Sequence, residues 1–421
     1  MVFRAMSPDD QLARLSSGTV EILPAAESLL DRLRLCAREG RPLRVKQGFD
    51  PTAPDIHLGH TVGLRKLRQF QDLGHQVVLI VGDYTGMVGD PSGRNKMRPQ
   101  LKREEVESHA RTYLEQFFKV LDPAPEPPRR PVEIHRNGEW FSVMDFMGVM
   151  RLASQYTVAR ILERDDFAKR MRDQQPIGLH ELFYPIMQGY DSVAIRADVE
   201  LGATEQKFNL LVGRVLQEIH GQPPQIAMTL PVLPGLDGVQ RMSKSLGNYV
   251  GVLDEPGDMY GKVMSLPDAV MGTYWRIVTD ADDDELAAVE RALADASVNP
   301  MSVKQRLAHR IVRIYHGPEA ADGAQRDFAT QFSRHETPEH LEEFGEAELA
   351  KALGHASAAG IVEVLVASGI AASKSAARRL VEQNAVSLDG EKVVSLDHPI
   401  DPGGTFVVRA GKKMKRFRPE N

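Results

Sequence analysis

Two short apolar segments flank one amphipathic helix pattern in residues 43–83, and this arrangement restricts the fold more than any other feature. The segment LRVKQGF, residues 43–49, ends at a proline turn and predicts a strand. Apolar residues then recur at helical spacing until Gly74, where the helix should end. The continuous apolar run QVVLIVG, residues 76–82, is typical of a strand in a parallel sheet. The sequence therefore predicts a strand–helix–strand unit, whose ligands bind beyond the carboxyl ends of the strands.

The remaining patterns extend this unit into an α/β fold with three parts. Strand patterns in VEIHRN, VAIRADVELGA and QIAMTLP, and a helix pattern in TEQKFNLLVGRVLQEIHG, indicate a Rossmann-like catalytic domain. We expect this domain at residues 1–254, with a connective insertion at about 115–175. A helical domain should follow at 255–350. Small residues near 355–360 suggest a linker to a small α+β domain at 358–421, with two short helices and strands around a turn at Leu388-Asp389-Gly390.

Composition excludes several classes of protein. The 421 residues are 42% hydrophobic and 26% charged, as in ordinary globular proteins. A formal net charge of −6 argues against a chain coated with basic charge, although a local basic patch remains possible. Cys36 is the single cysteine, which excludes an intrachain disulfide and a zinc ribbon. The N-terminus lacks an apolar signal-peptide core, and QVVLIVG is too short to span a bilayer. We therefore expect a cytoplasmic protein with no membrane partner.

The tetrapeptide HLGH, residues 57–60, lies at the start of the first predicted helix. The free amides and dipole of a helix N-terminus favour anions, imidazoles can bond phosphate oxygens, and Gly59 allows a close approach. The segment GDYTGMVGDPSGR follows the second strand and reaches the same sheet edge. Two alternatives stay open for HLGH alone: plain surface histidines, or a metal site, for which no third ligand has a recognisable spacing.

A second segment, RMSKS at residues 241–245, follows the last strand and a glycine turn. Arg241, Lys244 and Ser245 supply two cations and a hydroxyl, which could clamp departing phosphates in a transition state. Taken alone, the segment could be a solvated basic turn. Its occurrence together with HLGH favours a nucleotide site.

These motifs resemble the HIGH and KMSKS signatures of class I aminoacyl-tRNA synthetases. The stretches GDPSGR (89–94), YPIMQGYDS (184–192) and GATEQKFNLLVGR (202–214) narrow the resemblance to the tyrosyl-tRNA synthetases. The chain is most similar to their bacterial subfamily with a KMSKS-type loop. The resemblance covers essentially the whole chain, including a C-terminal RNA-binding domain of the ribosomal S-four type.

The resemblance implies a tyrosine subsite. Tyr184, Gln188 and Asp191 fall on one face of a predicted helix. In the family, the first two help to hold the tyrosine ammonium and the aspartate receives the phenol hydroxyl. Such a carboxylate would disfavour phenylalanine, which leaves it without a partner. Asp90 would also bind the ammonium, and Gln206 would lie near the reacting carboxylate.

The resemblance also implies an ATP subsite, with ATP as substrate accompanied by Mg²⁺ and no metal held by the protein alone. Thr52 and His57 would hold the γ-phosphate side, His60 the ribose side, and Gly48 and Asp50 the nucleotide pocket. Glu205 would meet the ribose. The residues expected to take part in catalysis are Thr52, His57, His60, Arg94, Arg98, Arg241, Lys244 and Ser245, and those expected to bind ATP are Gly48, Asp50, His57, Gly59, His60, Glu205 and Lys244.

Three positions depart from the family pattern. Many members carry a tyrosine where this chain has Lys46, and we hypothesise that Lys46 pairs with Asp83 at the end of the neighbouring strand. Glu205 replaces an aspartate that would hold the ribose. Its side chain is one methylene longer, so the contact with the ribose should shift. Arg241 replaces the first lysine of KMSKS, which keeps the charge and changes the geometry.

The C-terminal segment 358–421 is basic, although the whole chain is acidic. It has ten lysines and arginines against seven acids, a net charge of +3, which suits a phosphate backbone. The residues expected to bind RNA are Lys374, Arg378, Arg379, Lys412, Lys413, Lys415 and Arg416.

The resemblance implies activation of L-tyrosine with ATP, transfer of the tyrosyl group to the 3′ end of tRNA(Tyr), and a homodimer whose interface includes about 131–165. The alternatives are a tryptophanyl-tRNA synthetase and a non-catalytic RNA-binding protein on the same scaffold.

Overall fold

The computed structural model describes residues 6–91, 103–332, 341–353, 360–383, 385–396, 398, 400, 404–411 and 413–419. The predicted site residues Arg94, Arg98 and Lys412, and most of the predicted linker at 355–360, lie outside the described residues. The chain divides into two compact units, Met1–Ala321 and Asp322–Asn421.

A six-stranded sheet forms the centre of the first unit, in the order β1-β6-β5-β2-β3-β4. Neighbouring strands from β6 to β4 are parallel, and β1 pairs antiparallel with β6 at one edge. The strands are β1 (Glu21–Leu23), β2 (Arg44–Phe49), β3 (Gln76–Val81), β4 (Glu133–Arg136), β5 (Val199–Ala203) and β6 (Ile226–Leu230). The predicted parallel α/β sheet is confirmed, whereas the short strand β1 was not predicted.

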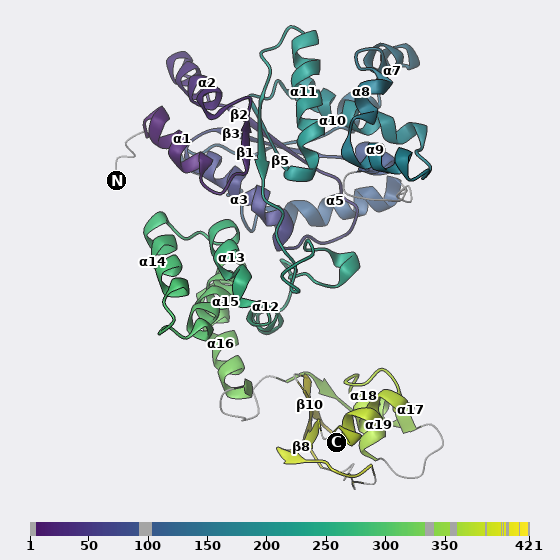
Figure 1. The fold of residues 1–421 in the computed structure, drawn as a ribbon. Coiled ribbons are helices and arrows are strands. Elements are labelled where there is room, and N and C mark those ends of the chain that lie inside the picture. Colours follow the sequence, from purple (N-terminus) through teal and green to yellow (C-terminus); the bar gives the residue numbers. More distant parts are fainter. Residues whose placement is uncertain are drawn as a thin grey trace. The chain divides into compact units, whose positions relative to one another are not determined.

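The helices that connect these strands cover both faces of the sheet. Helix α3 (Leu58–Asp72) links β2 to β3, and α11 (Lys207–Ile219) links β5 to β6. Because the strand order runs in opposite directions from β2 and β5, right-handed crossovers place α3 and α11 on opposite faces (Figure 1). Helix α10 (Tyr184–Ile195) packs beside α11.

The central strands β2 and β5 separate toward their carboxyl ends. They share two register pairs, Val45 with Val199 and Lys46 with Glu200. Beyond these pairs, β2 continues beside β3 as far as Phe49, and β5 continues beside β6 as far as Ala203. The reversal of strand order therefore opens a crevice above Lys46 and Glu200, where an α/β sheet usually binds its ligand.

Helical segments complete the first unit. The segment between β3 and β5 contributes α4 (Thr85–Val88), α5 (Arg103–Phe117), α6 (Gly138–Phe141), α7 (Phe146–Ala153), α8 (Val158–Leu162), α9 (Asp165–Arg172) and the 3₁₀ helix η1 (Leu179–Phe183). The N-terminal helices are α1 (Pro8–Ser16) and α2 (Ala26–Glu39), and those after the sheet are α12 (Pro256–Met264), α13 (Met271–Val278), α14 (Asp283–Ala294) and α15 (Pro300–His316). Helix α16 (Pro318–Phe332) begins in the first unit and continues past Ala321 into the second.

The region after the sheet packs against the α/β core. The buried Tyr315 hydroxyl of α15 donates to Thr61 Oγ1 of α3 at 3.1 Å. The domain boundary near residue 255 stays a prediction.

Among the helices in the described part of the chain, none is long and apolar enough to cross a membrane.

The second unit combines helices α17 (Glu346–Leu353), α18 (Ile361–Ala367) and α19 (Lys374–Glu382) with a five-stranded sheet. Its strands are β7 (Glu343–Phe344), β8 (Val386–Leu388), β9 (Glu391–Lys392), β10 (Phe406–Ala410) and β11 (Lys413–Phe417), in the order β7-β11-β10-β8-β9. Asp389 and Gly390 both have positive φ, as a tight two-residue hairpin turn requires. The predicted turn is therefore confirmed.

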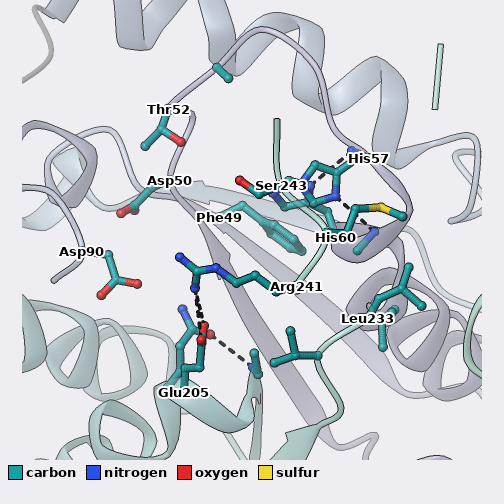
Figure 2. Close-up of a pocket in the computed structure, with 18 of the residues that line it drawn as sticks. Phe49, Asp50, Thr52, His57, His60, Asp90, Glu205, Leu233, Arg241 and Ser243 are labelled. Atoms are coloured by element: carbon teal, nitrogen blue, oxygen red, sulfur yellow. Dashed lines mark hydrogen bonds and ion pairs between the residues drawn. The ribbon is translucent and has the colours of Figure 1, made fainter. Parts of the chain in front are cut away.

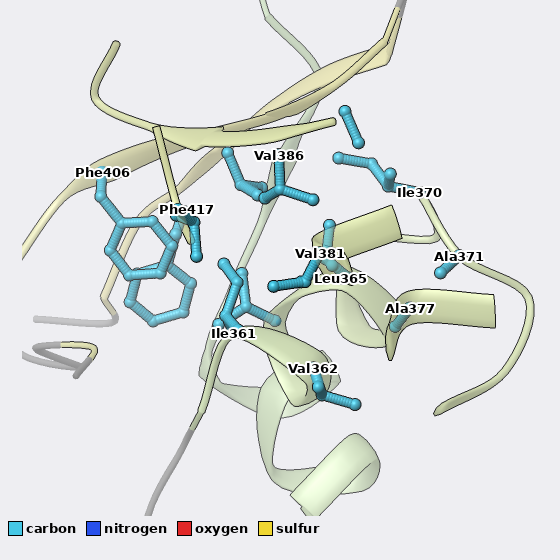
Figure 3. Packing of buried hydrophobic residues seen from close by; sticks show 14 of the residues in the cluster. Ile361, Val362, Leu365, Ile370, Ala371, Ala377, Val381, Val386, Phe406 and Phe417 are labelled. Atoms are coloured by element: carbon cyan, nitrogen blue, oxygen red, sulfur yellow. The ribbon is translucent and has the colours of Figure 1, made fainter. Parts of the chain in front are cut away.

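Two stacked phenylalanines anchor the core of the second unit. Phe406 and Phe417 pair across β10 and β11, with ring centroids 4.7 Å apart and an interplanar angle of 17° (Figure 3). Phe417 is fully buried, and the apolar side chains of α18 and α19 complete the cluster.

Replacement of Phe417 by alanine is expected to lower the free energy of unfolding of the second unit by about 3–5 kcal/mol, because a buried ring is lost and a cavity remains. Amide hydrogen exchange followed by mass spectrometry should show faster exchange in β10 and β11. Val394→Ala, at a side chain that is 73% exposed, is the control and should leave exchange unchanged. Unchanged protection in Phe417→Ala would contradict the assignment of this core.

Candidate active site

A cavity of about 560 Å³ lies at the carboxyl ends of the parallel strands. Such a volume is typical of small-molecule sites. The predicted site residues that line it are Gly48, Asp50, Thr52, His57, Gly59, His60, Asp90, Tyr184, Glu205, Gln206, Arg241, Lys244 and Ser245. The structure therefore brings HLGH, RMSKS and the segments after β2 and β5 to one place, although they are far apart in sequence (Figure 2).

The two histidines of HLGH form the N-terminal cap of α3. His57 Nδ1 accepts from the Gly59 amide at 3.1 Å, and His60 Nδ1 accepts from the His57 amide at 3.2 Å. The rings lie against each other, with centroids 4.0 Å apart. Because both Nδ1 atoms accept, each neutral ring carries its proton on Nε2 and can donate it to an oxygen ligand.

Burial keeps both rings uncharged. It lowers the pKa of His57 to about 2, aided by nearby His60 and Lys244. Burial and Lys244 lower the pKa of His60 to about 4. The histidines therefore act as neutral hydrogen-bond donors near neutral pH, and the positive charge of the site comes from other groups.

Gly59 has a packing role that the sequence analysis did not anticipate. A Cβ atom at this position would lie 2.9 Å from the His57 ring, closer than real Cβ contacts allow. The glycine therefore makes room for the His57 imidazole. The predicted close approach of a nucleotide to Gly59 stays a prediction.

The cations of RMSKS pair with carboxylates across the cavity. Arg241 Nη1 lies 3.0 and 2.8 Å from the two carboxylate oxygens of Glu205 (Figure 2). Lys244 Nζ lies 3.7 Å from Asp55 Oδ2. Asn248 holds the loop from behind, since its side chain accepts from the Ser243 amide and donates to Asp237 at 2.9 Å.

Two carboxylates at the opposite side of the cavity are held by neighbours. Asp50 accepts from the Tyr184 hydroxyl at 2.9 Å and from Thr85 Oγ1 at 2.7 Å. Asp90 Oδ1 lies 3.4 Å from Arg164 Nη2, which comes from the segment before α9. The predicted site residues Asp50 and Tyr184 are therefore direct partners, a contact that the sequence analysis did not foresee.

Gln188 and Asp191 do not line the cavity and lie on the inner face of α10. The Gln188 amide donates to Glu200 Oε1 at 3.1 Å and accepts from Asn209 at 2.8 Å. Asp191 accepts from Trp140 Nε1 at 2.9 Å and from Asn137 Nδ2 at 3.4 Å. Their roles in tyrosine binding stay predictions.

Sequence reasoning missed Asn137 and Trp140, although a signal was present. Asn137 directly follows the strand β4, whose carboxyl end meets the same sheet edge as β2 and β3. Asn137 also donates to Thr85 Oγ1 at 3.0 Å, which connects the surroundings of Asp191 to those of Asp50. The position of Asn137 directly after a parallel strand is therefore the signal that places a polar side chain at this edge of the sheet.

The hypothesis that Lys46 pairs with Asp83 is wrong. Lys46 Nζ lies 2.9 Å from Glu200 Oε1, its register partner on the adjacent strand β5. Asp83 follows the end of β3, whereas Lys46 is level with Val78 on that strand. The Asp83 carboxylate accepts instead from the Gly138 amide at 2.7 Å.

The sequence is similar to known proteins along most of its length. A family model described as "tRNA synthetases class I (W and Y)" matches residues 38–333, and a model of the "Tyrosine--tRNA ligase SYY-like C-terminal domain" matches residues 344–415. The tyrosine–tRNA ligase of Moorella thermoacetica is 51% identical over 96% of this chain and 94% of the relative. The tyrosine–tRNA ligase of Thermotoga maritima is 48% identical over 97% of each chain.

Solved structures share the fold at lower identity. The tyrosyl-tRNA synthetase of Archaeoglobus fulgidus, complexed with L-tyrosine, has a TM-score of 0.61 and 20% identity over 76% of this chain and 99% of its own. A truncated mitochondrial tyrosyl-tRNA synthetase of Aspergillus nidulans has a TM-score of 0.63 and 19% identity over 77% of this chain and 94% of its own.

The Asp191 carboxyl is expected to titrate near neutral pH. Burial raises its pKa to about 7, against the opposing effects of Lys46 and of the Trp140 and Asn137 donors. Trp140 bonds this carboxyl directly, so its fluorescence should report the titration. In a Trp275→Phe background, which leaves Trp140 as the only tryptophan of the chain, the emission should change with a midpoint near pH 7. The step should vanish in Asp191→Asn; its persistence there would assign it to another group.

Proposed function

This chain belongs to the class I tyrosyl-tRNA synthetases, and we propose that the cavity at its strand ends is where it activates tyrosine. The chain is a tyrosine–tRNA ligase. The tyrosine carboxylate attacks the α-phosphorus of ATP and pyrophosphate leaves. A ribose hydroxyl at the 3′ end of the tRNA then attacks the tyrosyl carbonyl of the adenylate, and AMP leaves. The observation that carries the assignment of the site is that HLGH and RMSKS line one cavity, although about 180 residues separate them.

The phosphates of ATP meet donors and cations in this proposal. His57 offers an Nε2 proton, Thr52 offers a hydroxyl, and the α3 N-terminus favours negative charge, while His60 offers its Nε2 proton on the ribose side. Arg241 and Lys244 supply the charge that the neutral histidines lack. They are paired with carboxylates that are partly exposed, and phosphates carry more negative charge than a single carboxylate, so ATP can compete for them. Arg94 and Arg98 would add to this set.

The remaining site residues would hold the rest of ATP and the amino acid. Gly48, Asp50, Gly59 and Glu205 would contact the nucleotide, and Ser245 would support the loop through Ser243, whose hydroxyl lies 2.9 Å away. Asp90, Tyr184 and Gln206 line the cavity and would meet the tyrosine backbone. Gln188 and Asp191 would complete the subsite from α10, with Asp191 facing the phenol.

Magnesium would arrive with ATP. Mg²⁺ is usually held by one or two carboxylates and substrate phosphates, so no preformed protein cage is required. Within the described ranges, no group of three or more histidines, cysteines and carboxylates could hold a metal ion. Asp50 and Asp90 are among the carboxylates that line the cavity and could meet an ion that arrives with the phosphates.

The second unit would bind tRNA(Tyr) through exposed basic residues. Lys374, Arg378 and Arg379 lie on α19 and are exposed, so they can reach a phosphate backbone, although Lys374 Nζ lies 3.1 Å from Glu363 Oε1. On β11, Lys415 pairs with Glu342 and Arg416 lies 3.7 Å from Glu343. Lys374, Lys415 and Arg416 would therefore exchange carboxylate partners for phosphates, and Lys413 would join them.

A homodimer would bury an apolar surface within the segment 131–165. Val143, Phe146, Met147, Met150 and Val158 are exposed large apolar side chains, mostly on α7 and the turn before it. Exposed apolar clusters of this kind mark protein interfaces. We propose that a second copy of the chain covers them, and that the enzyme works in the cytoplasm.

The decisive test of the site is tyrosine-dependent exchange of labelled pyrophosphate into ATP. The chain should catalyse exchange with tyrosine and not with tryptophan or phenylalanine. His57→Ala should reduce the rate by about 10²-fold or more, because a donor to the transition state is lost. The exposed His220→Ala should leave it unchanged. A folded chain that binds RNA and exchanges with no amino acid would favour the non-catalytic alternative.

The oligomer is tested by the mass in solution. Light scattering after gel filtration should give twice the 46.7 kDa of the chain. Phe146→Asp, at a side chain that is 76% exposed, should shift the mass toward one chain, because a buried unpaired charge opposes association. Met301→Asp, on the exposed side of α15, should leave the dimer intact. A dimer that is indifferent to Phe146→Asp would place the interface elsewhere.

A further inference from the structure

We propose that Lys46 and Glu200 position the tyrosine-binding helix α10, rather than contact tyrosine themselves. The inference rests on the proposed function, in which Gln188 and Asp191 of α10 serve the tyrosine subsite. It concerns the position where many relatives carry a tyrosine and this chain has a lysine. The contacts of Lys46 indicate what the lysine does at this position.

The ion pair is fully buried, and each proton of the Lys46 ammonium has an acceptor. Both side chains are 0% exposed, and the Nζ–Oε1 distance is 2.9 Å. Lys46 Nζ also donates to the Gln188 carbonyl at 2.9 Å and to Ser192 Oγ at 2.8 Å. The three protons of the ammonium group therefore have three acceptors.

Glu200 binds the same turns of the helix from the adjacent strand. Its Oε1 accepts from the Gln188 side chain at 3.1 Å, and its Oε2 accepts from Ser192 Oγ at 3.0 Å. A further donor, Gln225, reaches Oε2 from the segment before β6. Gly213 of α11 leaves room for this cluster, since a Cβ there would lie 2.6 Å from the Gln225 amide.

These contacts bracket Asp191. Gln188 and Ser192 are one helical turn apart, and Asp191 lies between them on the same buried part of α10. Lys46 and Glu200 therefore fix the rotation and height of this turn relative to β2 and β5. A shift of the turn would move the carboxylate away from its Trp140 and Asn137 donors and from the phenol.

The location of the pair explains why the helix needs such an attachment. Lys46 and Glu200 form the last register pair before β2 and β5 separate. Beyond Lys46 and Glu200, the described residues of β2 and β5 form no register pairs that would define the distance between the two strands. The ion pair therefore holds the base of the substrate cavity together at the point where sheet hydrogen bonding between these strands ends.

Calorimetric titration with L-tyrosine tests this inference, with the exchange assay alongside. Lys46→Met should raise the Kd for tyrosine by about tenfold or more, because a displacement of about 1 Å in a positioning group can cost about 10²-fold. The KM for ATP should change much less. The double variant Lys46→Met/Glu200→Gln, which leaves no lone buried charge, should recover thermal stability while its affinity for tyrosine stays low, because α10 still lacks the contacts of Lys46.

Lys66→Met is the matched control for the loss of a buried lysine. Lys66 is 5% exposed, and its ammonium binds the carbonyls of Leu15 and Ser17 and the side chain of Gln69, away from α10. This variant should lose thermal stability and keep its affinity for tyrosine. If Lys46→Met does not fold, Glu200→Gln provides the same test, since it leaves Lys46 bound to the helix and weakens its tie to β5.

The outcomes separate this inference from the proposed function. Absence of tyrosine-dependent exchange in the unaltered chain would remove the proposed function itself. Normal exchange in that chain, with unchanged tyrosine affinity in folded Lys46→Met or in Glu200→Gln, would overturn the positioning role alone. Equal losses of tyrosine affinity in Lys46→Met and Lys66→Met would also overturn it, because the effect would then be general destabilisation.

Discussion

The separation of β2 and β5 is the constraint on which the rest of the molecule depends. Two parallel strands that share only two register pairs must diverge, and their carboxyl ends then form the walls of a crevice. Each segment that leaves a strand at this edge, after β2, β3, β5 or β6, contributes side chains to the same cavity. The site is therefore a consequence of strand order, and the motifs supply its chemistry.

Burial divides the ion pairs of this site into two kinds. Lys46 and Glu200 are excluded from water, so removal of either partner leaves a costly lone charge and the pair is fixed. The pair of Arg241 with Glu205 is about one-third exposed, and surface pairs of this kind contribute little to stability. The fixed pair suits the base of the cavity, and the weak pair suits the proposed role of the loop, in which Arg241 exchanges its carboxylate partner for a phosphate.

The sequence predicted what depends on local pattern. The strand–helix–strand unit at residues 43–83 was predicted because an apolar run, a helical period and a terminal glycine are each local. The partner of Lys46 could not be read in the same way. Glu200 is about 150 residues away and becomes a neighbour only because β5 pairs with β2. The wrong choice of Asp83 followed sequence order, in which β3 is the next strand, although a central strand has two neighbours.

Two departures from the family pattern turn out to be one feature of the structure. Glu205 and Arg241 each differ from the expected residue, and the sequence gives no reason to connect them. In the structure Arg241 Nη1 lies 2.8 and 3.0 Å from the two carboxylate oxygens of Glu205 across the cavity. Glutamate reaches one methylene further than aspartate, which brings its carboxylate to the Arg241 guanidinium on the other side of the cavity. In the proposed site, the ribose contact of Glu205 and the phosphate clamp of Arg241 are therefore parts of one interaction.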